Sequence, residues 1–291
     1  WKKLKLGLSL AQDGFDYKEI KKITLEAERV GVDSVWFLDH LNASPRPDEQ
    51  QFLECWTLLS ALSVETTSVR LGSLVLNVNN RNPALLSKMV ATLDMISSGR
   101  LDFGIGAGGT NRAEQQKKLG YEYEFDAYGI PFPTTPSIRI EKLDEGLEIM
   151  KRMWTQHSAT FTGEHYSIKD AFCLPKPVQK PYPPIWIGSR FGSKMMRVVA
   201  KHADGWNMNR VTTVEDFQKG RKLLKEFCSR IGRNADEIKT SVVITGSMTE
   251  CEQRLKEFAD KDLDLAILRI PRGKEIEYLR EIKHTLRETI F

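Results

Sequence analysis

Residues 71–109 read LGSLVLNVNNRNPALLSKMVATLDMISSGRLDFGIGAGG, and this stretch decides the fold. The apolar run at 71–78 predicts a strand that is covered on both faces. Asn82 and Pro83 suit the cap and the first position of a helix, whose apolar residues recur at helical spacing up to Ser97-Ser98-Gly99. A second strand begins at Leu101. A strand, a helix and a second strand predict a right-handed βαβ unit with parallel strands.

The same alternation continues in both directions from this unit. The expected strands are 4–10, 34–38, 71–78, 101–106, 184–188, 204–209, 240–245 and 265–270. The expected helices are 17–30, 48–64, 83–97, 138–154, 193–202, 214–231, 249–258 and 274–288. Eight such units in 291 residues predict one (β/α)₈ TIM-barrel domain over 1–291. An open, doubly wound sheet is the alternative.

Two segments interrupt the rhythm, at about 110–136 and 158–182. The first contains Gly120, Gly129 and three prolines, with room for a short helix at 112–119. The second combines two short strands around Thr162-Gly163-Glu164 with a proline-rich connector. Both exceed ordinary connection lengths, so we interpret them as insertions over a ligand site at the carboxyl ends of the strands.

Composition excludes several functional classes. Lys plus Arg is 43 and Asp plus Glu is 39, a net charge of +4 that is too mild and too scattered to predict a nucleic-acid partner. No apolar run approaches the roughly 20 residues of a membrane span, and no apolar signal region is present. Four separated cysteines without a CxxC or His-Cys cluster predict buried free thiols, no metal site and a cytoplasmic protein.

The strongest chemical pair is Asp39-His40, directly after the second expected strand. Functional groups of a TIM barrel gather at such strand ends. A histidine titrates near neutrality and can donate or accept a proton, and an adjacent carboxylate can tune it. The alternative is a helix-capping aspartate beside a structural histidine.

Glycines mark two further strand ends. Gly104, Gly106, Gly108 and Gly109 carry no side chains, so a flat ring or a phosphate could approach the backbone there. Their spacing does not match a dinucleotide fingerprint. In IGSRFGS (187–193), exposed amides before a helix could bind phosphate, with help from Arg190 or Lys194; a simple turn is equally compatible.

Two other polar features leave alternatives open. Glu54 lies within an apolar helical pattern, so it is either a buried structural carboxylate or a side chain that points into the barrel mouth. His165-Tyr166 lies on the expected hairpin, where packing is favoured over chemistry. The sequence contains no HExxH, no nucleophile elbow and no P-loop.

Taken together, these motifs resemble the bacterial-luciferase-like superfamily and, within it, the coenzyme F420-dependent oxidoreductases. The segments that carry the resemblance lie in order within residues 1–210: SVWFLDHL, ECWTLLSAL, RNPALLSKMVATLDMISSGRLDFGIGAG, YGIPFP, TGEHY, PKPVQKPYPPIWIGS and KHADGWN. Each segment alone is weak, but the combination is specific. The last third matches more loosely.

The resemblance implies a homodimer that binds F420, or alternatively FMN, with the ring over the end of the third strand. It implies a non-prolyl cis peptide among Ser73, Leu74, Val75 and Leu76. It also places Asp39 and His40 beside the deazaflavin, where the pair serves proton transfer or substrate binding. In the leading hypothesis His40 handles the proton and Asp39 orients His40. The implied cofactor contacts are Asp39, Ser73, Leu74, Val75, Leu76, Asn77, Gly106, Gly108, Gly188 and Ser189. Helices 48–64 and 83–97 are the expected dimer interface.

One departure from the family pattern bears on the substrate. The sugar-phosphate dehydrogenase branch has a catalytic glutamate where this chain has Gly109, and neither Glu114 nor Glu124 aligns with it, so that substrate class is not expected. The leading hypothesis is an F420-dependent oxidoreductase that acts on a small organic substrate. The alternatives are an FMN-dependent monooxygenase that uses O₂ and a non-catalytic flavin-binding barrel.

Overall fold

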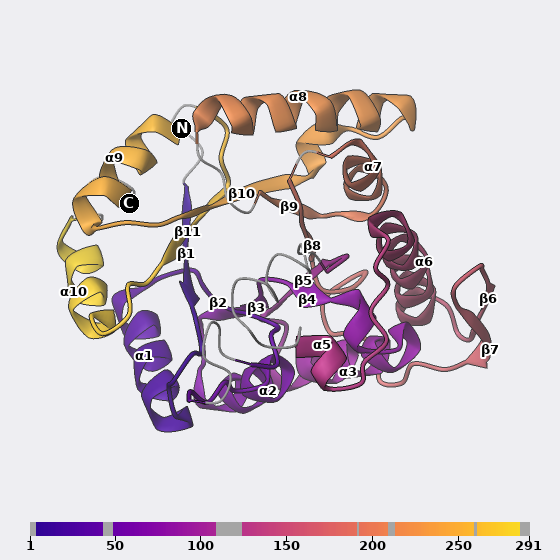
Figure 1. Ribbon diagram of the computed structural model, residues 1–291, viewed down its shortest axis with the longest axis horizontal. Helices are drawn as coiled ribbons and strands as arrows, with labels where there is room; N and C mark the ends of the chain where they lie inside the picture. Colours follow the sequence, from indigo (N-terminus) through magenta and orange to yellow (C-terminus); the bar gives the residue numbers. More distant parts are fainter. Residues whose placement is uncertain are drawn as a thin grey trace.

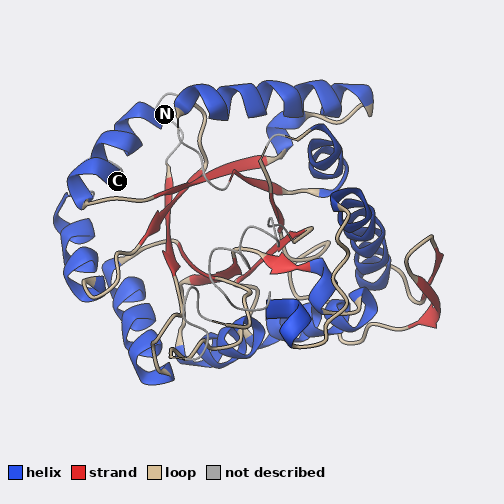
Figure 2. Cartoon of the chain, in the orientation of Figure 1, coloured by secondary structure: helices blue, strands red, loops and turns tan. Residues whose placement is uncertain are grey.

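In the computed structural model, parallel strands close into a barrel. The structure describes residues 4–42, 49–108, 124–190, 192–208, 213–258 and 261–285. The eight barrel strands, in spatial order, are β1 (Lys5–Leu10), β2 (Ser34–Phe37), β3 (Arg70–Ser73), β5 (Leu101–Gly106), β8 (Ile185–Gly188), β9 (Gly205–Met208), β10 (Lys239–Ile244) and β11 (Leu265–Arg269). Because β11 pairs with β1, the ring is complete, which confirms the predicted barrel and rules out the open sheet (Figure 2).

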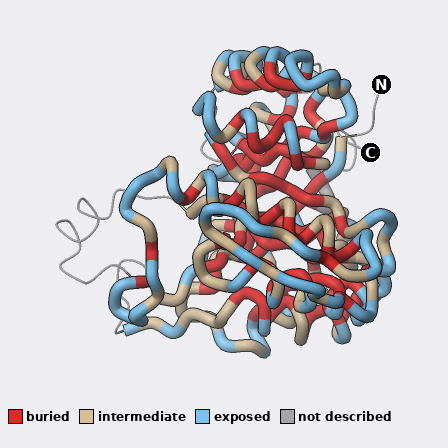
Figure 3. Tube along the Cα trace, turned by 90° about the vertical axis from the view of Figure 1, so that its right-hand side faces the viewer, coloured by how far each residue is buried: buried red, intermediate tan, exposed pale blue. Residues whose placement is uncertain are grey.

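Helices surround the ring of strands (Figure 1). They are α1 (Tyr17–Val30), α2 (Cys55–Glu65), α3 (Pro83–Ile96), α6 (Pro136–Thr155), α7 (Ser193–His202), α8 (Val214–Arg230), α9 (Met248–Phe258) and α10 (Glu275–Thr285). Short elements are η1 (Val78–Asn80), α5 (Glu124–Ala127) and η2 (Ala235–Glu237). Figure 3 shows the buried residues concentrated in the strands and on the inward sides of the helices, as amphipathic helices on a barrel require.

Two tryptophans fill the barrel interior. Trp36 on β2 and Trp186 on β8 meet edge to face, with ring centroids 5.7 Å apart. A Cβ at Gly72 would lie 2.3 Å from the Trp36 ring, and one at Gly205 would lie 2.3 Å from the Trp186 ring, so both strands need glycine there. The interior is therefore packed, and ligand sites belong at the carboxyl ends of the strands.

The predicted strand 71–78 is interrupted. After β3 the Leu74–Val75 peptide is cis, and the chain continues as the short β4 (Leu76–Asn77), which pairs with β5. The cis peptide predicted among Ser73 to Leu76 is thereby confirmed.

One predicted helix boundary is wrong. The helix expected at 48–64 begins at Cys55, because the Glu54 side chain caps it by accepting hydrogen bonds from the backbone N–H groups of Trp56 and Thr57. Residues 49–54 are not helical. The other predicted strands and helices in the described ranges agree with the structure to within a few residues. The short helix expected at 112–119 lies outside the described residues.

The insertion at 158–182 forms a hairpin of β6 (Ala159–Thr162) and β7 (Ser167–Ala171), which packs on α6, and then a connector. All four cysteines are free and buried, as predicted. None of the described helices combines the length and the apolar composition that crossing a bilayer requires.

Candidate functional site at the ends of β2 and β4

Asp39 is the centre of a buried polar network. It follows β2, and its side chain is only 1% exposed. Both carboxylate oxygens accept hydrogen bonds from the Arg81 guanidinium, each at 3.0 Å. One oxygen also accepts the backbone N–H of Asn77 at 2.9 Å and the side-chain amide of Asn80 at 3.2 Å. Asp39 thus ties the end of β2 to β4 and to the segment before α3.

Arg81 extends this network to a second carboxylate, Glu54. Burial would lower the pKa of Arg81, but Asp39 and Glu54 outweigh it and raise that pKa. Burial would raise the pKa of Glu54, but hydrogen bonds from the first turn of α2 and the charge of Arg81 lower it. The structure supports a structural role for Glu54, which caps α2 and pairs with Arg81, but its side chain is 40% exposed rather than buried.

His40 is positioned by Glu124, to which the sequence analysis assigned no role. Its Nδ1 lies 2.7 Å from Oε1 of Glu124 on α5, whereas Asp39 is engaged with Arg81. We expected Asp39 to orient the His40 ring. In the structure Glu124, and not Asp39, is hydrogen-bonded to that ring. Burial would lower the pKa of His40, but the hydrogen bond and the charge of Glu124 outweigh it, so the pKa is raised. Because the side chain is still 52% exposed, it can exchange protons with a ligand or with water.

The four residues around the cis peptide face in different directions. Ser73 is fully buried, where its hydroxyl donates to the carbonyl of Gly104 at 2.7 Å. Leu76 packs in the main core between strands and helices. Leu74 and Val75 join the cluster inside the barrel with Trp36 and Trp186. Of the four, only Leu74 and Val75 belong to the inner wall of the barrel.

The glycines at the neighbouring strand ends have a packing reason. A Cβ at Gly106 would lie 2.9 Å from a methyl of Val75, and one at Gly188 would lie 3.0 Å from both Val75 methyls. Gly108 has φ +69°, and a Cβ there would lie 2.5 Å from the Asn77 side chain. The space that these glycines leave is thus occupied by Val75 and Asn77, which places Val75 against β5 and β8.

Ser189, the other predicted cofactor contact, directs its hydroxyl into the protein. That hydroxyl lies 3.2 Å from Nε1 of Trp206 and 3.8 Å from Sδ of Met196. The adjoining helix α7 begins after Gly192, which has no side chain to cap it. The first N–H groups of α7 are therefore the donors that this turn can offer to an anionic group.

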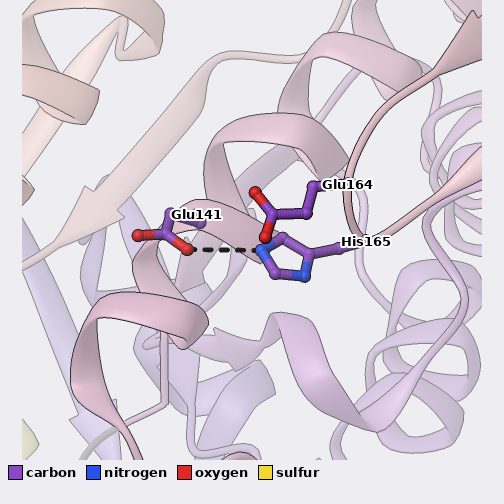
Figure 4. A group of neighbouring side chains, drawn as sticks. All are labelled: Glu141, Glu164 and His165. Carbon is purple, nitrogen blue, oxygen red and sulfur yellow. Dashed lines mark hydrogen bonds and ion pairs between the residues drawn. The ribbon is translucent and has the colours of Figure 1, made fainter.

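A second group of polar side chains lies at the hairpin, where Glu141 of α6 meets Glu164 and His165 (Figure 4). His165 Nε2 is 3.4 Å from Glu141. One turn along α6, Glu145 accepts the backbone N–H groups of residues 164–166. Both Glu141 and Glu164 are exposed. These contacts hold the hairpin on α6, in agreement with the packing interpretation of His165.

No role in the site was assigned from the sequence to three residues that the structure places there. Arg81 and Glu124 complete the two networks, and the fully buried Gln12 bonds both the N–H and the C=O of Leu38 and the C=O of Leu53. The position of Arg81 in NNRNP, between a strand end and a helix start, could have indicated that it belongs to the site. Nothing in the sequence around Glu124 indicates a role for it, apart from its place before YGIPFP. Gly109 and Glu114 lie outside the described residues.

The sequence and the fold are similar to those of known proteins. The family model described as luciferase-like monooxygenase matches residues 4–288. An uncharacterized protein of Mycobacterium tuberculosis is 32% identical over 192 residues, which are 65% of this chain and 61% of that protein. The chain thus spans about three fifths of the length of this relative.

Two further proteins are similar to this chain. An F420-dependent glucose-6-phosphate dehydrogenase of Intrasporangium calvum is 29% identical over 251 residues, 83% of this chain and 69% of that protein. The structure of a coenzyme F420-dependent tetrahydromethanopterin reductase from Methanopyrus kandleri superposes with a TM-score of 0.81 at 16% identity and covers 99% of this chain and 100% of that one. The latter likeness establishes the fold.

Proposed function

This chain belongs to the luciferase-like monooxygenase family, and on that premise we propose that it is an oxidoreductase that uses coenzyme F420 to transfer a hydride to or from a small organic substrate. The observation that carries the proposal is His40, a half-exposed histidine at a strand end whose Nδ1 is held by a carboxylate. The F420-dependent relative supports the choice of cofactor.

The residues at the strand ends suit a deazaflavin. Val75 offers an apolar surface between the glycines of β5 and β8 against which a flat ring can pack. The uncapped start of α7 supplies backbone N–H groups for an anionic tail. Leu74, Val75, Gly188 and the first turn of α7 would hold the cofactor, while Ser73, Leu76 and Ser189 would support it from behind. When bound, the deazaflavin supplies or accepts the hydride.

His40 handles the proton that accompanies the hydride. In the direction of reduction, the imidazolium gives the Nε2 proton to the substrate oxygen and becomes neutral; in the direction of oxidation, the neutral ring takes that proton. Asp39 does not exchange protons in this scheme, because Arg81, Asn77 and Asn80 already occupy its oxygens. Its role is to fix the segment that carries His40.

Parallel fluorescence titrations with F420 and FMN test the cofactor, and bleaching of reduced F420 tests turnover. We expect F420 to bind, and we expect His40→Asn to retain binding while turnover falls by about 100-fold or more. The proposal is wrong if F420 does not bind, and the role of His40 is wrong if His40→Asn turns over at the wild-type rate.

The description of the family model supports a monooxygenase as the second candidate, for which FMN would be the cofactor. A 5-deazaflavin has carbon where the flavin has N5, so it does not support the oxygen chemistry of a reduced flavin. Consumption of O₂ with reduced FMN, and not with reduced F420, identifies this candidate. A non-catalytic flavin-binding barrel is the third candidate; it predicts binding without turnover of either cofactor.

We also propose that the protein is a homodimer through α2, α3 and the connector after β7. Lys88 of α3 donates to the carbonyl of Leu174 at 2.9 Å, which places the connector beside α3. Large apolar side chains exposed on these elements are Val64, Leu85, Met95, Ile96, Phe172, Leu174 and Val178. A second copy would cover this surface. Light scattering should give a dimer mass, and Leu85→Glu should give monomer; a wild-type monomer contradicts the proposal.

A further inference from the structure

Glu124 connects the first insertion to the loop that carries His40. It is the first residue of α5, and its side chain is only 11% exposed. Oε2 accepts the backbone N–H of Leu41 at 2.7 Å and that of Asn42 at 3.4 Å, while Oε1 lies 2.7 Å from His40 Nδ1. The hydrogen bonds from the backbone of Leu41 and Asn42 fix Oε2 of Glu124. Because the carboxylate is planar, Oε1 is then held beside the His40 ring.

The α5 segment has further contacts that hold it in place. Phe125 stacks on Phe132 with ring centroids 5.2 Å apart, and Leu41 packs against this pair. The Tyr128 hydroxyl donates to Asn42 at 3.1 Å. The carboxylate of Glu124 therefore reaches His40 from a segment that is itself anchored to residues 41 and 42.

A carboxylate at Nδ1 decides which ring nitrogen reacts. An ionised carboxylate only accepts hydrogen bonds, so the Nδ1 that faces it carries the hydrogen. In the neutral ring Nε2 is then the bare nitrogen, and it has no hydrogen-bond partner among the described residues. A proton enters and leaves at Nε2, while Nδ1 keeps its hydrogen throughout.

We propose that Glu124 is a positioning residue that holds His40 in the Nδ1–H tautomer and thereby makes Nε2 the atom that exchanges a proton with the substrate. This inference rests on the proposed function only for its kinetic consequence, because the tautomer belongs to the protein alone. The proton that Nε2 gives to a substrate oxygen is restored from water, so that the ring returns to its starting state.

The charged groups that face His40 all raise the pKa of its ring. Glu124 on α5, Asp39 on the same loop and Asp13 after β1 each raise the pKa of His40 against the effect of burial. Phe52, whose ring meets the imidazole edge to face at 6.3 Å, is uncharged. Of these groups, only Glu124 has a hydrogen bond to the ring, so its removal should change both the tautomer and the titration.

Nitrogen-15 NMR of the histidine rings, without any cofactor, tests the inference directly. The wild-type protein should show His40 as the Nδ1–H tautomer, with His40→Asn used to assign the signal. In Glu124→Gln, one amide oxygen cannot serve both the backbone N–H groups and the ring, so the tautomer should shift toward Nε2–H and the His40 pKa should fall. A wild-type Nε2–H tautomer overturns the proposal even if the variant does not fold.

Glu141→Gln is the matched control, because Glu141 faces the ring of His165 on the hairpin rather than that of His40. It should leave the His40 signals unchanged. With F420 and substrate, Glu124→Gln should lower kcat on the order of ten-fold and move the His40 limb of the pH profile to lower pH, with KM for F420 unchanged.

These outcomes separate the two proposals. If Glu124 only anchors the insertion, Glu124→Gln changes stability or KM but not the tautomer or the pH profile, and the inference is wrong. If the NMR result holds and F420 is neither bound nor turned over, the proposed function fails while the positioning of His40 by Glu124 stands.

Discussion

Replacing Arg81 with methionine should destabilise the protein strongly, because it leaves the Asp39 charge buried without its cation. The Asp39 side chain is 1% exposed and the Arg81 side chain 13% exposed, so little water can take the place of the guanidinium. Removing one member of a buried ion pair typically costs about 3–5 kcal/mol. Methionine keeps much of the apolar stem of arginine, so the loss reports on the charge and its hydrogen bonds.

The structure places this variant near the lower end of that range. Asp39 keeps its hydrogen bonds from the Asn77 N–H and the Asn80 amide, and Glu54 is 40% exposed and can be solvated. We therefore expect Arg81→Met to lower the free energy of unfolding by about 3 kcal/mol. Urea denaturation followed by circular dichroism and by tryptophan fluorescence measures the change, and coincident transitions justify a two-state treatment.

A surface arginine supplies the matched control. Arg29 pairs with Glu26 one turn earlier on α1, and its side chain is 58% exposed, so Arg29→Met should change the free energy of unfolding far less than Arg81→Met does. In the double variant Asp39→Asn/Arg81→Met, the loss should be smaller than the sum of the single losses by at least about 1 kcal/mol. Additive losses, or an Arg81→Met effect no larger than that of Arg29→Met, refute the reasoning.

Two further variants test other parts of the barrel. Burial would raise the pKa of Glu28, but hydrogen bonds from the backbone of residues 67–69 lower it to about 2; its stabilisation is therefore complete above pH 4.5 and lost as the pH falls toward 2. Glu28→Gln should cost about 1–2 kcal/mol in urea titrations at pH 7, and much less at pH 3. Gly104→Ala should cost about 3 kcal/mol or more in thermal unfolding, because its Cβ would lie 1.8 Å from the Ser73 carbonyl oxygen. Gly192→Ala, with no described atom within 4 Å of its Cβ, should be neutral.

Local patterns determined most of the architecture. Helix α3 spans Pro83–Ile96 as its Asn-Pro start and its apolar spacing predict, and α7 spans Ser193–His202 as predicted. These boundaries depend on residues within a turn or two of the helix end, which the sequence displays directly. Eight alternating units then leave closure into a barrel as the favoured arrangement. The resemblance to a family also placed a cis peptide among Ser73 to Leu76, and the structure has it at Leu74–Val75.

The partners of the site residues were decided by tertiary structure alone. His40 meets Glu124 across 84 positions, and Asp39 meets Arg81 across 42. The sequence placed Asp39 next to His40 and suggested that the two cooperate, but consecutive residues point in different directions at a strand end. Only barrel closure and the return of the first insertion bring each of them its real partner.

The glycines of residues 71–109 illustrate the same division. Their positions at a strand end predicted open space, and the sequence alone could not say what occupies it. In the folded protein Val75 lies against Gly106 and Gly188, and Asn77 lies against Gly108. Periodicity along one chain segment fixes where strands and helices form, because it depends on local geometry. The occupant of a gap between segments depends on how distant segments pack, so it is fixed only when the barrel has closed.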